Sequence, residues 1–521
     1  MNAELTPVPV PDWPKLAWVA RLSAGEKSAE VFHGPCVEAN ARWCVEAVWD
    51  GPYEKGGFDR SDLVFGSGVR CRGGDIIFVS PGSTLDRLWY HHLGDTWHVG
   101  NTLPGLLSVA DVSLCKEGVA YSRLMDSITR GVIGYERAVP CSRGDLGVVY
   151  FNNLFWNGHR LEEIDKPDTA PRFDTFDTYV RYLEESADGL SANLGAAQRS
   201  HRVSSLVTVS QGYDSSLAAV VAKRMGCRHS VTIGQSSSFW RGSDSGEEVA
   251  RYLGLECATF PRKARCYPYE ESVWAVSGRA GILNWALFDY PEPLSLFLTG
   301  PYGDKMWGRT PWEYSDPFEF TGLSLGGIGE FRLYRGVFHC PLPFWGMRHL
   351  RELWEITASQ PMQSWSIPGD YDRPIPRRIV EEAGVPRGAF GQRKKNTSHD
   401  EALLWPYGNE AAESYRRFLR DRGLPVPGGA AVWLQRRLAA AALLVEANLP
   451  RGFIGTVRRR RKEAMSGAAD QLFLWANEVL QKDYREAFRN AVSLPGDGPC
   501  LPGVDRSSHD QGDQAPGLLL R

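Results

Sequence analysis

Apolar and polar residues alternate in several short runs within the first 165 residues of the chain. The runs are separated by Gly, Pro and Asp, and the clearest lie at residues 41–51, 75–80, 96–100 and 146–151. A period of two is typical of strands with one buried face, and turn residues between such runs favour antiparallel pairing. The pattern therefore predicts stacked antiparallel sheets, a β-sandwich, in this part of the chain.

Strands and helices alternate after a linker-like stretch at 166–173. We expect, in chain order, a helix at 176–198, a strand at 204–210, a helix at 215–225, a strand at 229–233, a helix at 245–253 and a strand at 294–299. Such alternation is typical of an α/β fold with a parallel sheet. Beyond about residue 345 the pattern becomes helical, ending with a helix at 471–491.

The patterns predict four parts: a β-rich domain at 1–170, an α/β domain at 171–400, a helical extension at 401–492 and a tail at 493–521. A chain of 521 residues suits two or three domains. The tail is rich in Gly, Pro, Asp and Ser, a composition that predicts disorder.

Composition is ordinary for a soluble globular protein, with 43% hydrophobic and 23% charged residues. Without a long apolar run or a signal-like N-terminus, we expect a cytoplasmic protein and no membrane span. The net charge of −3 gives no bulk reason to expect nucleic-acid binding, although residues 458–462 are all basic. That run predicts a solvated face or, alternatively, a site for phosphate, tRNA or an acidic peptide. Ten cysteines without a CxxC pair indicate free thiols and no structural metal.

The strongest chemical signal lies where the strand at 204–210 runs directly into a helix, at residues 210–215, Ser-Gln-Gly-Tyr-Asp-Ser. A turn of this kind and the following helix N-terminus form a cradle for polyanions. Ser210 and Ser215 would add hydroxyl donors, and Gly212 permits close approach of the backbone. Asp214 would repel a bare phosphate, but it can hold Mg²⁺ against a pyrophosphate. The segment predicts a magnesium–nucleotide site, with a chance turn as the alternative.

These six residues resemble the Ser-Gly-Gly-x-Asp-Ser loop of the PP-loop ATP pyrophosphatases, with Gln211 in place of the first Gly. In those enzymes the second strand ends over the adenine, which implies that role for Ile233 and Gly234. Residues 243–254 resemble the acidic helix of the same enzymes, which ends in Tyr-Leu-Gly. Without the resemblance, that stretch would be an amphipathic surface helix.

Over most of residues 40–400 the chain resembles the asparagine synthetase B superfamily, which includes β-lactam synthetase and lasso-peptide cyclases. Residues 297–304, Phe-Leu-Thr-Gly-Pro-Tyr-Gly-Asp, are similar to the second pyrophosphate and Mg²⁺ loop of this family, Ser/Thr-Gly-x-Gly-x-Asp. The similarity implies that Thr299 and Gly300 bind the nucleotide and that Asp304 joins Asp214 as a Mg²⁺ ligand. The loop departs from the synthetases in having Lys305 after the Asp, and a plain strand-end turn is the alternative.

The resemblance also implies three catalytic residues. Tyr302, with Glu330 as partner, would act as base on the attacking amine, as a Tyr and a Glu do in β-lactam synthetase. A surface glutamate is the alternative for Glu330. Lys394, or failing it Lys395, would neutralise the α-phosphate and the departing pyrophosphate, a task suited to a compact cation. A basic loop without such a role is the alternative.

The N-terminal domain of this family is often a glutaminase whose nucleophile is a cysteine at position 2. Position 2 is Asn2 here, and the first cysteine is Cys36. An N-terminal nucleophile needs its thiol and its α-amine on one residue. We therefore expect a degenerate Ntn-hydrolase-like β-sandwich, followed by a PP-loop (HUP-like) parallel α/β domain with a helical C-terminal part.

The residues and the resemblance together predict an ATP-dependent, AMP-forming carbon–nitrogen ligase that does not use glutamine. It would adenylate a substrate carboxylate, release pyrophosphate and pass the acyl group to an amine, giving a lactam, macrolactam or amide. The expected cofactors are ATP and Mg²⁺, the expected substrate is a small molecule or peptide with both groups, and a homodimer is compatible with the sequence. The alternatives are a catalytically weak pseudo-synthetase scaffold and a PP-loop enzyme that modifies a tRNA base.

Overall fold

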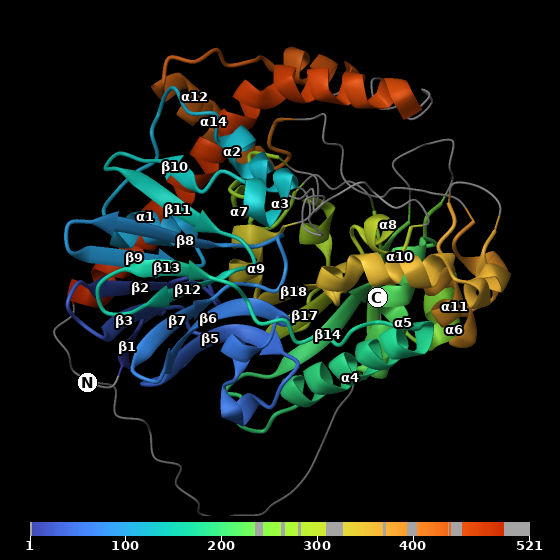
Figure 1. Cartoon of the computed structure of the whole chain (residues 1–521). Helices are drawn as coiled ribbons and strands as arrows, with labels where there is room; N and C mark the ends of the chain where they lie inside the picture. Colours follow the sequence, from blue (N-terminus) through green and yellow to red (C-terminus); the bar gives the residue numbers. More distant parts are fainter. Residues whose placement is uncertain are drawn as a thin grey trace, which may run out of the picture.

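The strands of the protein form three sheets (Figure 1). The computed structural model describes residues 3–234, 243–261, 266–279, 283–308, 327–367, 371–392, 404–435, 437–438 and 451–493, without the side chains of 451–465. Two sheets lie in the first 165 residues and one in the following part. The prediction of a mixed α/β protein, with antiparallel and parallel sheets, is confirmed.

The first sheet has the strand order β1-β3-β2-β9-β8-β11-β10, and all its pairs are antiparallel except β1 with β3. Its strands are β1 (Glu4–Pro9), β2 (Trp18–Ser23), β3 (Ser28–His33), β8 (Leu88–Leu93), β9 (Thr96–Gly100), β10 (Ala138–Pro140) and β11 (Asp145–Val149). The second sheet is antiparallel throughout, in the order β13-β12-β7-β6-β5-β4. Its strands are β4 (Glu38–Asn40), β5 (Trp43–Trp49), β6 (Val64–Arg72), β7 (Asp75–Val79), β12 (Asn153–Trp156) and β13 (Leu161–Ile164).

These two sheets pack face to face. Trp18 of β2 stacks on Phe78 of β7 with ring centroids 6.3 Å apart, and both belong to a buried apolar cluster that the two sheets share. The four strands expected from alternation correspond to β5, β7, β9 and β11. Alternation located these strands because each has one face toward the shared core.

The third sheet is parallel, in the order β16-β15-β14-β17-β18. Its strands are β14 (Val203–Thr208), β15 (His229–Ile233), β16 (Glu256–Phe260), β17 (Leu294–Thr299) and β18 (Val337–Pro341). The expected strands at 204–210, 229–233 and 294–299 are β14, β15 and β17. β16 and β18 were not expected, and neither alternates: β16 is an edge strand without a buried residue, and every residue of β18 is buried.

Helices cover the parallel sheet and join it to the sandwich. α5 (Tyr213–Arg224) packs on β14 and carries α4 (Phe176–Leu194) and α11 (Pro374–Glu382) on its outer side (Figure 1). The other α-helices described are α1 (Leu103–Val109), α2 (Tyr121–Asp126), α3 (Gly131–Gly134), α6 (Glu247–Leu253), α7 (Glu270–Trp274), α8 (Gly303–Met306), α9 (Gly329–Arg335), α10 (Leu350–Ala358), α12 (Asn409–Asp421) and α14 (Arg451–Ser493).

The long helix α14 connects the two halves of the molecule. It packs against α1 and α2 of the sandwich half and against α7 of the parallel half. Asn477 in α14 donates to Ala275 O at 3.2 Å, and Gln481 donates to Val112 O at 2.8 Å. One continuous cluster of buried apolar side chains accordingly extends from the sandwich through the parallel sheet to α14. Among the described helices, none is long and apolar enough to span a membrane.

Candidate nucleotide site

The two loops singled out in the sequence lie where the parallel sheet changes direction. β14 is the first strand of this sheet along the chain; β15 and β16 follow on one side of it, and β17 and β18 on the other. In open α/β sheets ligands bind at this switch point, in the crevice beyond the carboxyl ends of the strands. The loop after β14 and the loop after β17 therefore occupy the position at which such sheets bind ligands.

The loop after β14 is held in shape by its own hydroxyl groups. Ser210 Oγ lies 2.7 Å from Ser215 Oγ and accepts a hydrogen bond from Gly212 N at 3.1 Å. Ser210 N donates to Ser215 Oγ at 3.1 Å. Gly212 is the N-cap of α5, and the first N–H groups of a helix lack partners within it. The structure thus brings Ser210, Gly212 and Ser215 together at one helix N-terminus.

Two glycines allow the loop after β17 to contact the first turn of α5. A Cβ atom at Gly300 would lie 2.5 Å from the carbonyl carbon of Asp214 and 2.7 Å from Ser215 N. A Cβ atom at Gly303 would lie 2.4 Å from Asp214 Cγ. Tyr302, between these glycines, adopts a left-handed conformation with φ of +75°. No side chain fits at either glycine, so Gly-Pro-Tyr-Gly is explained by contact between the loops.

Asp214 forms an ion pair with Arg373, the residue immediately before α11. Only 5% of the Arg373 side chain is exposed. Burial alone would lower the pKa of this guanidinium, but Asp214 outweighs that effect and the pKa is raised, with Asp304 contributing. Burial and the carboxylates Asp214, Asp244 and Asp304 raise the pKa of Tyr371. Asp214 and Asp304, the carboxylates predicted to hold Mg²⁺, thus both stabilise the positive charge of the buried Arg373.

Residues 371–391 form the outer wall of this site. Tyr371 OH accepts a hydrogen bond from Tyr213 N at 3.4 Å, and Gly391 N donates to Gln211 O at 2.8 Å. A Cβ atom at Gly391 would lie 2.4 Å from the Tyr213 ring. These contacts join segments roughly 160–180 residues apart through a tyrosine, an arginine and a glycine, so no local sequence pattern predicts them.

The other predicted nucleotide-binding residues lie at the ends of β15 and β17. Ile233 is buried, and Gly234 N donates to Phe260 O at 3.2 Å. Thr299 Oγ1 lies 2.9 Å from Nε2 of the buried His339. Burial lowers the pKa of His339 to about 3, so its ring is neutral and can exchange a hydrogen bond with Thr299. Lys394 and Lys395 lie outside the described residues.

Glu330 lies in α9, where its hydrogen bonds tie the two halves of the molecule together. Its carboxylate accepts from Thr102 Oγ1 at 3.0 Å, from Leu103 N at 3.0 Å and from Tyr484 OH at 3.1 Å. These partners belong to the N-terminus of α1 and to α14, and none belongs to either loop. The alternative of a surface glutamate is wrong, since Glu330 is 6% exposed. Its contacts indicate a structural role.

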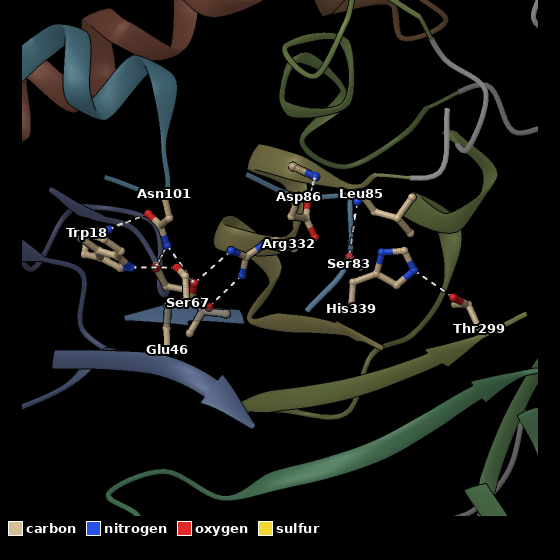
Figure 2. A network of polar contacts seen from close by, with 12 residues as sticks. Trp18, Glu46, Ser67, Ser83, Leu85, Asp86, Asn101, Thr299, Arg332 and His339 are labelled. Atoms are coloured by element: carbon tan, nitrogen blue, oxygen red, sulfur yellow. Dashed lines mark hydrogen bonds and ion pairs between the residues drawn. The ribbon is translucent and has the colours of Figure 1, made fainter. Parts of the chain in front are cut away.

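A second buried polar network is centred on Arg332, two residues after Glu330 in the chain (Figure 2). Arg332 of α9 forms two hydrogen bonds with Glu46 of β5, at 2.7 and 2.9 Å, and lies 3.7 Å from Asp86. Figure 2 shows Arg332 between Glu46 on one side and His339 with Thr299 on the other. The hydrogen bond between Thr299 and His339 lies next to this network (Figure 2).

Glu330→Gln should make the protein less sensitive to pH. Burial raises the pKa of Glu330 to about 7 from 4.5, so the folded state binds a proton more readily than the unfolded state. Glu330 therefore contributes up to about 3 kcal/mol to the free energy of unfolding below pH 4.5. This contribution is lost as the pH rises toward 7. An amide keeps the shape and can donate to Thr102 or Tyr484. Between pH 5 and 8, the free energy of unfolding in urea should fall less in the variant than in the wild type. An equal fall in both proteins would contradict the assignment of this pH effect to Glu330.

No model of a known protein family matches the chain, and no curated protein matches it either. Within the described ranges, no group of three or more His, Cys, Asp or Glu side chains is placed to hold a metal ion. A magnesium–nucleotide site requires fewer protein ligands, because one or two carboxylates suffice when phosphates supply the remaining oxygens. Asp214 and Asp304 match that smaller donor set.

Proposed function

We propose that the protein is an ATP-dependent, AMP-forming ligase that joins a substrate carboxylate to a substrate amine. The observation that supports it best is the contact between the two loops at the switch point. Gly300 and Gly303 lie against Asp214 and Ser215, in a sheet whose strand order directs ligands to this edge. A hydroxyl pair, a helix N-terminus and two carboxylates at one place suit a polyphosphate with its counter-ion.

The residues present suit Mg²⁺ and ATP in their charge and in their donor groups. Asp214 and Asp304 would hold the ion, which when bound neutralises phosphate charge. Ser210, Ser215 and the first N–H groups of α5 would bind and orient the phosphates. The presence of a buried guanidinium beside both carboxylates supports the fit, since it indicates that this position accepts a positive charge.

The proposed reaction has two steps. A carboxylate oxygen of the substrate bonds to the α-phosphorus of ATP, and pyrophosphate leaves. An amine then attacks the acyl carbon, AMP leaves, and a proton passes from the amine to a base. Tyr302 would accept that proton as its phenolate, and Lys394 would stabilise the departing pyrophosphate through its charge. Positioning of both substrates would supply a large part of the rate.

The sandwich has a structural role in this proposal. We assign it as a degenerate Ntn-hydrolase-like domain, and the parallel sheet with its helices as a PP-loop domain. Glu46 in β5 and Thr102 beside α1 contact Arg332 and Glu330 of α9, which lies between β17 and β18 in the chain. These contacts join the sandwich to α9, which packs on β18 of the sheet that carries the proposed nucleotide site.

A scaffold without catalysis is a second candidate, and one observation favours it. The Asp214–Arg373 ion pair occupies a carboxylate that a nucleotide-bound metal would need. A tRNA-modifying enzyme has no comparable support.

Product analysis tests the ligase proposal against the scaffold. The protein is incubated with Mg²⁺, ATP and a pool of peptides and amino acids that carry both groups. We expect equal amounts of AMP and pyrophosphate and a product that has lost one water, without added glutamine. Release of ADP, or a requirement for glutamine, would contradict the proposal. No turnover together with tight binding of ATP would favour the scaffold.

A further inference from the structure

Arg373 is the best candidate for a residue that responds to nucleotide, because it bonds directly to a carboxylate proposed to hold the metal. It precedes α11, which packs on α5, and it bonds to the carboxylate of Asp214 in the first turn of α5. Its guanidinium also lies 5.2 Å from the ring centroid of Tyr371. The Arg373 guanidinium is therefore held next to the loop after β14 by the Asp214 carboxylate and the Tyr371 ring.

Arg377 of α11 adds a second buried positive charge on this side of the loop after β14. Arg377 lies one helical turn after Arg373, and its side chain is 1% exposed. It forms an ion pair with Glu381 at 3.6 Å, and among the residues that the structure describes its Nε and Nη2 atoms find no hydrogen-bond partner. The guanidinium lies 5.0 Å from the ring centroid of Tyr213, which follows Gly212 in the loop. Two buried guanidinium groups thus lie beside the segment proposed to bind phosphates.

Because Arg373 and Asp214 form a buried ion pair, binding of a metal ion and binding of a nucleotide depend on each other. If a metal ion alone took Asp214, Arg373 would be left buried without its acid. If a nucleotide alone took Arg373, Asp214 would face the phosphates without a counter-ion. Leaving one member of a buried pair uncompensated is strongly unfavourable. Metal and nucleotide together satisfy both groups, because the metal binds the carboxylate and the phosphates bind the guanidinium.

We propose that Arg373 exchanges partners, holding Asp214 while the site is empty and turning to the polyphosphate when a nucleotide and a divalent cation bind together. This inference rests on the proposed nucleotide site. It makes Arg373 a positioning residue that couples cation binding to nucleotide binding. Neither ligand alone binds tightly, and each raises the affinity of the other by the same factor, ~5–150-fold for couplings of ordinary size.

The test measures binding, with Mn²⁺ as the cation and α,β-methylene ATP as the nucleotide. In the wild type we expect weak Mn²⁺ binding without nucleotide and tight binding with it. Arg373→Met removes the competing cation, so Mn²⁺ alone should bind ~10-fold or more tightly, and the coupling between the ligands should fall. Arg387→Met is the matched control, because Arg387 pairs with Glu381 at the exposed end of the same segment. It should behave as the wild type does.

The outcomes separate this inference from the function on which it rests. One outcome is that the wild type binds nucleotide in a metal-dependent way while Arg373→Met binds Mn²⁺ no more tightly than the wild type. That outcome overturns the partner exchange of Arg373 and leaves the proposed nucleotide site standing. No nucleotide binding by the folded wild type overturns both. If Arg373→Met does not fold, Arg373→Lys provides the test. Lysine keeps the positive charge, so Mn²⁺ binding without nucleotide should stay weak. It lacks the two parallel N–H groups with which arginine binds a phosphate, so nucleotide affinity should fall ~10-fold. Unchanged nucleotide affinity in that variant overturns the inference.

Discussion

Arg332→Met should lower the free energy of unfolding by about 3–5 kcal/mol, the usual cost of removing one partner from a buried ion pair. The Arg332 side chain is 3% exposed, and that of Glu46 is fully buried. The substitution would leave Glu46 and Asp86 without their cation at the junction between sandwich and parallel sheet. Glu46 is fully buried, so its carboxylate would lose its cation without gaining bulk solvent.

Urea unfolding monitored by tryptophan fluorescence measures this effect. The matched control is Arg130→Met, because Arg130 pairs with Glu136 while half of each side chain is exposed. That variant should lose only about 0–1 kcal/mol. A loss below about 1 kcal/mol in Arg332→Met would mean that the sandwich and the parallel sheet do not depend on this network.

Asp214→Asn and Asp304→Asn should each abolish most of the stabilisation that Mg²⁺ and an ATP analogue give to the protein. A ligand that binds only the folded state raises its stability in proportion to the logarithm of its concentration over Kd. A charge-assisted contact contributes about 1.5–3 kcal/mol, so affinity should fall roughly 10–100-fold. Asparagine keeps the shape of aspartate, and in Asp214→Asn its oxygen can still accept a hydrogen bond from Arg373.

The melting temperature with and without Mg²⁺ and α,β-methylene ATP measures this loss. Asp188→Asn is the control, because Asp188 lies exposed on α4, where it pairs with Arg224. Its melting temperature should rise with ligand as much as that of the wild type. An equal rise in Asp304→Asn would exclude Asp304 from the site, and the second loop would then act through Thr299 and Gly300 alone.

Elements with a clear period or a strand-to-helix junction could be predicted from the sequence. β17 was expected at 294–299 and is observed at Leu294–Thr299, because a run of apolar and β-branched residues precedes a Gly-Pro turn. The junction of β14 with α5 follows from Gly212 as N-cap. β1 and β3 carry no comparable pattern, since both contain exposed and buried residues out of alternation.

The polar contacts of the site could not be predicted, because they depend on tertiary structure. Arg373 lies 159 residues from Asp214, and nothing in a Tyr-Asp-Arg-Pro sequence indicates an ion pair with a distant loop. The resemblance implies that Glu330 is the partner of Tyr302. The fold instead turns its carboxylate toward Thr102 and Tyr484, where it caps α1 and anchors α14. A resemblance in sequence does not fix the direction of a side chain.

Calorimetric titration of the wild-type protein with α,β-methylene ATP, in the presence and absence of Mg²⁺, tests the central claim most directly. The analogue cannot be cleaved between its α- and β-phosphates, so the titration reports binding without turnover. The proposed site predicts saturable binding at one site per chain that requires Mg²⁺ and is lost in Asp214→Ala. Folded protein that binds no nucleotide under these conditions would contradict the claim, and the two loops would then be a structural junction only.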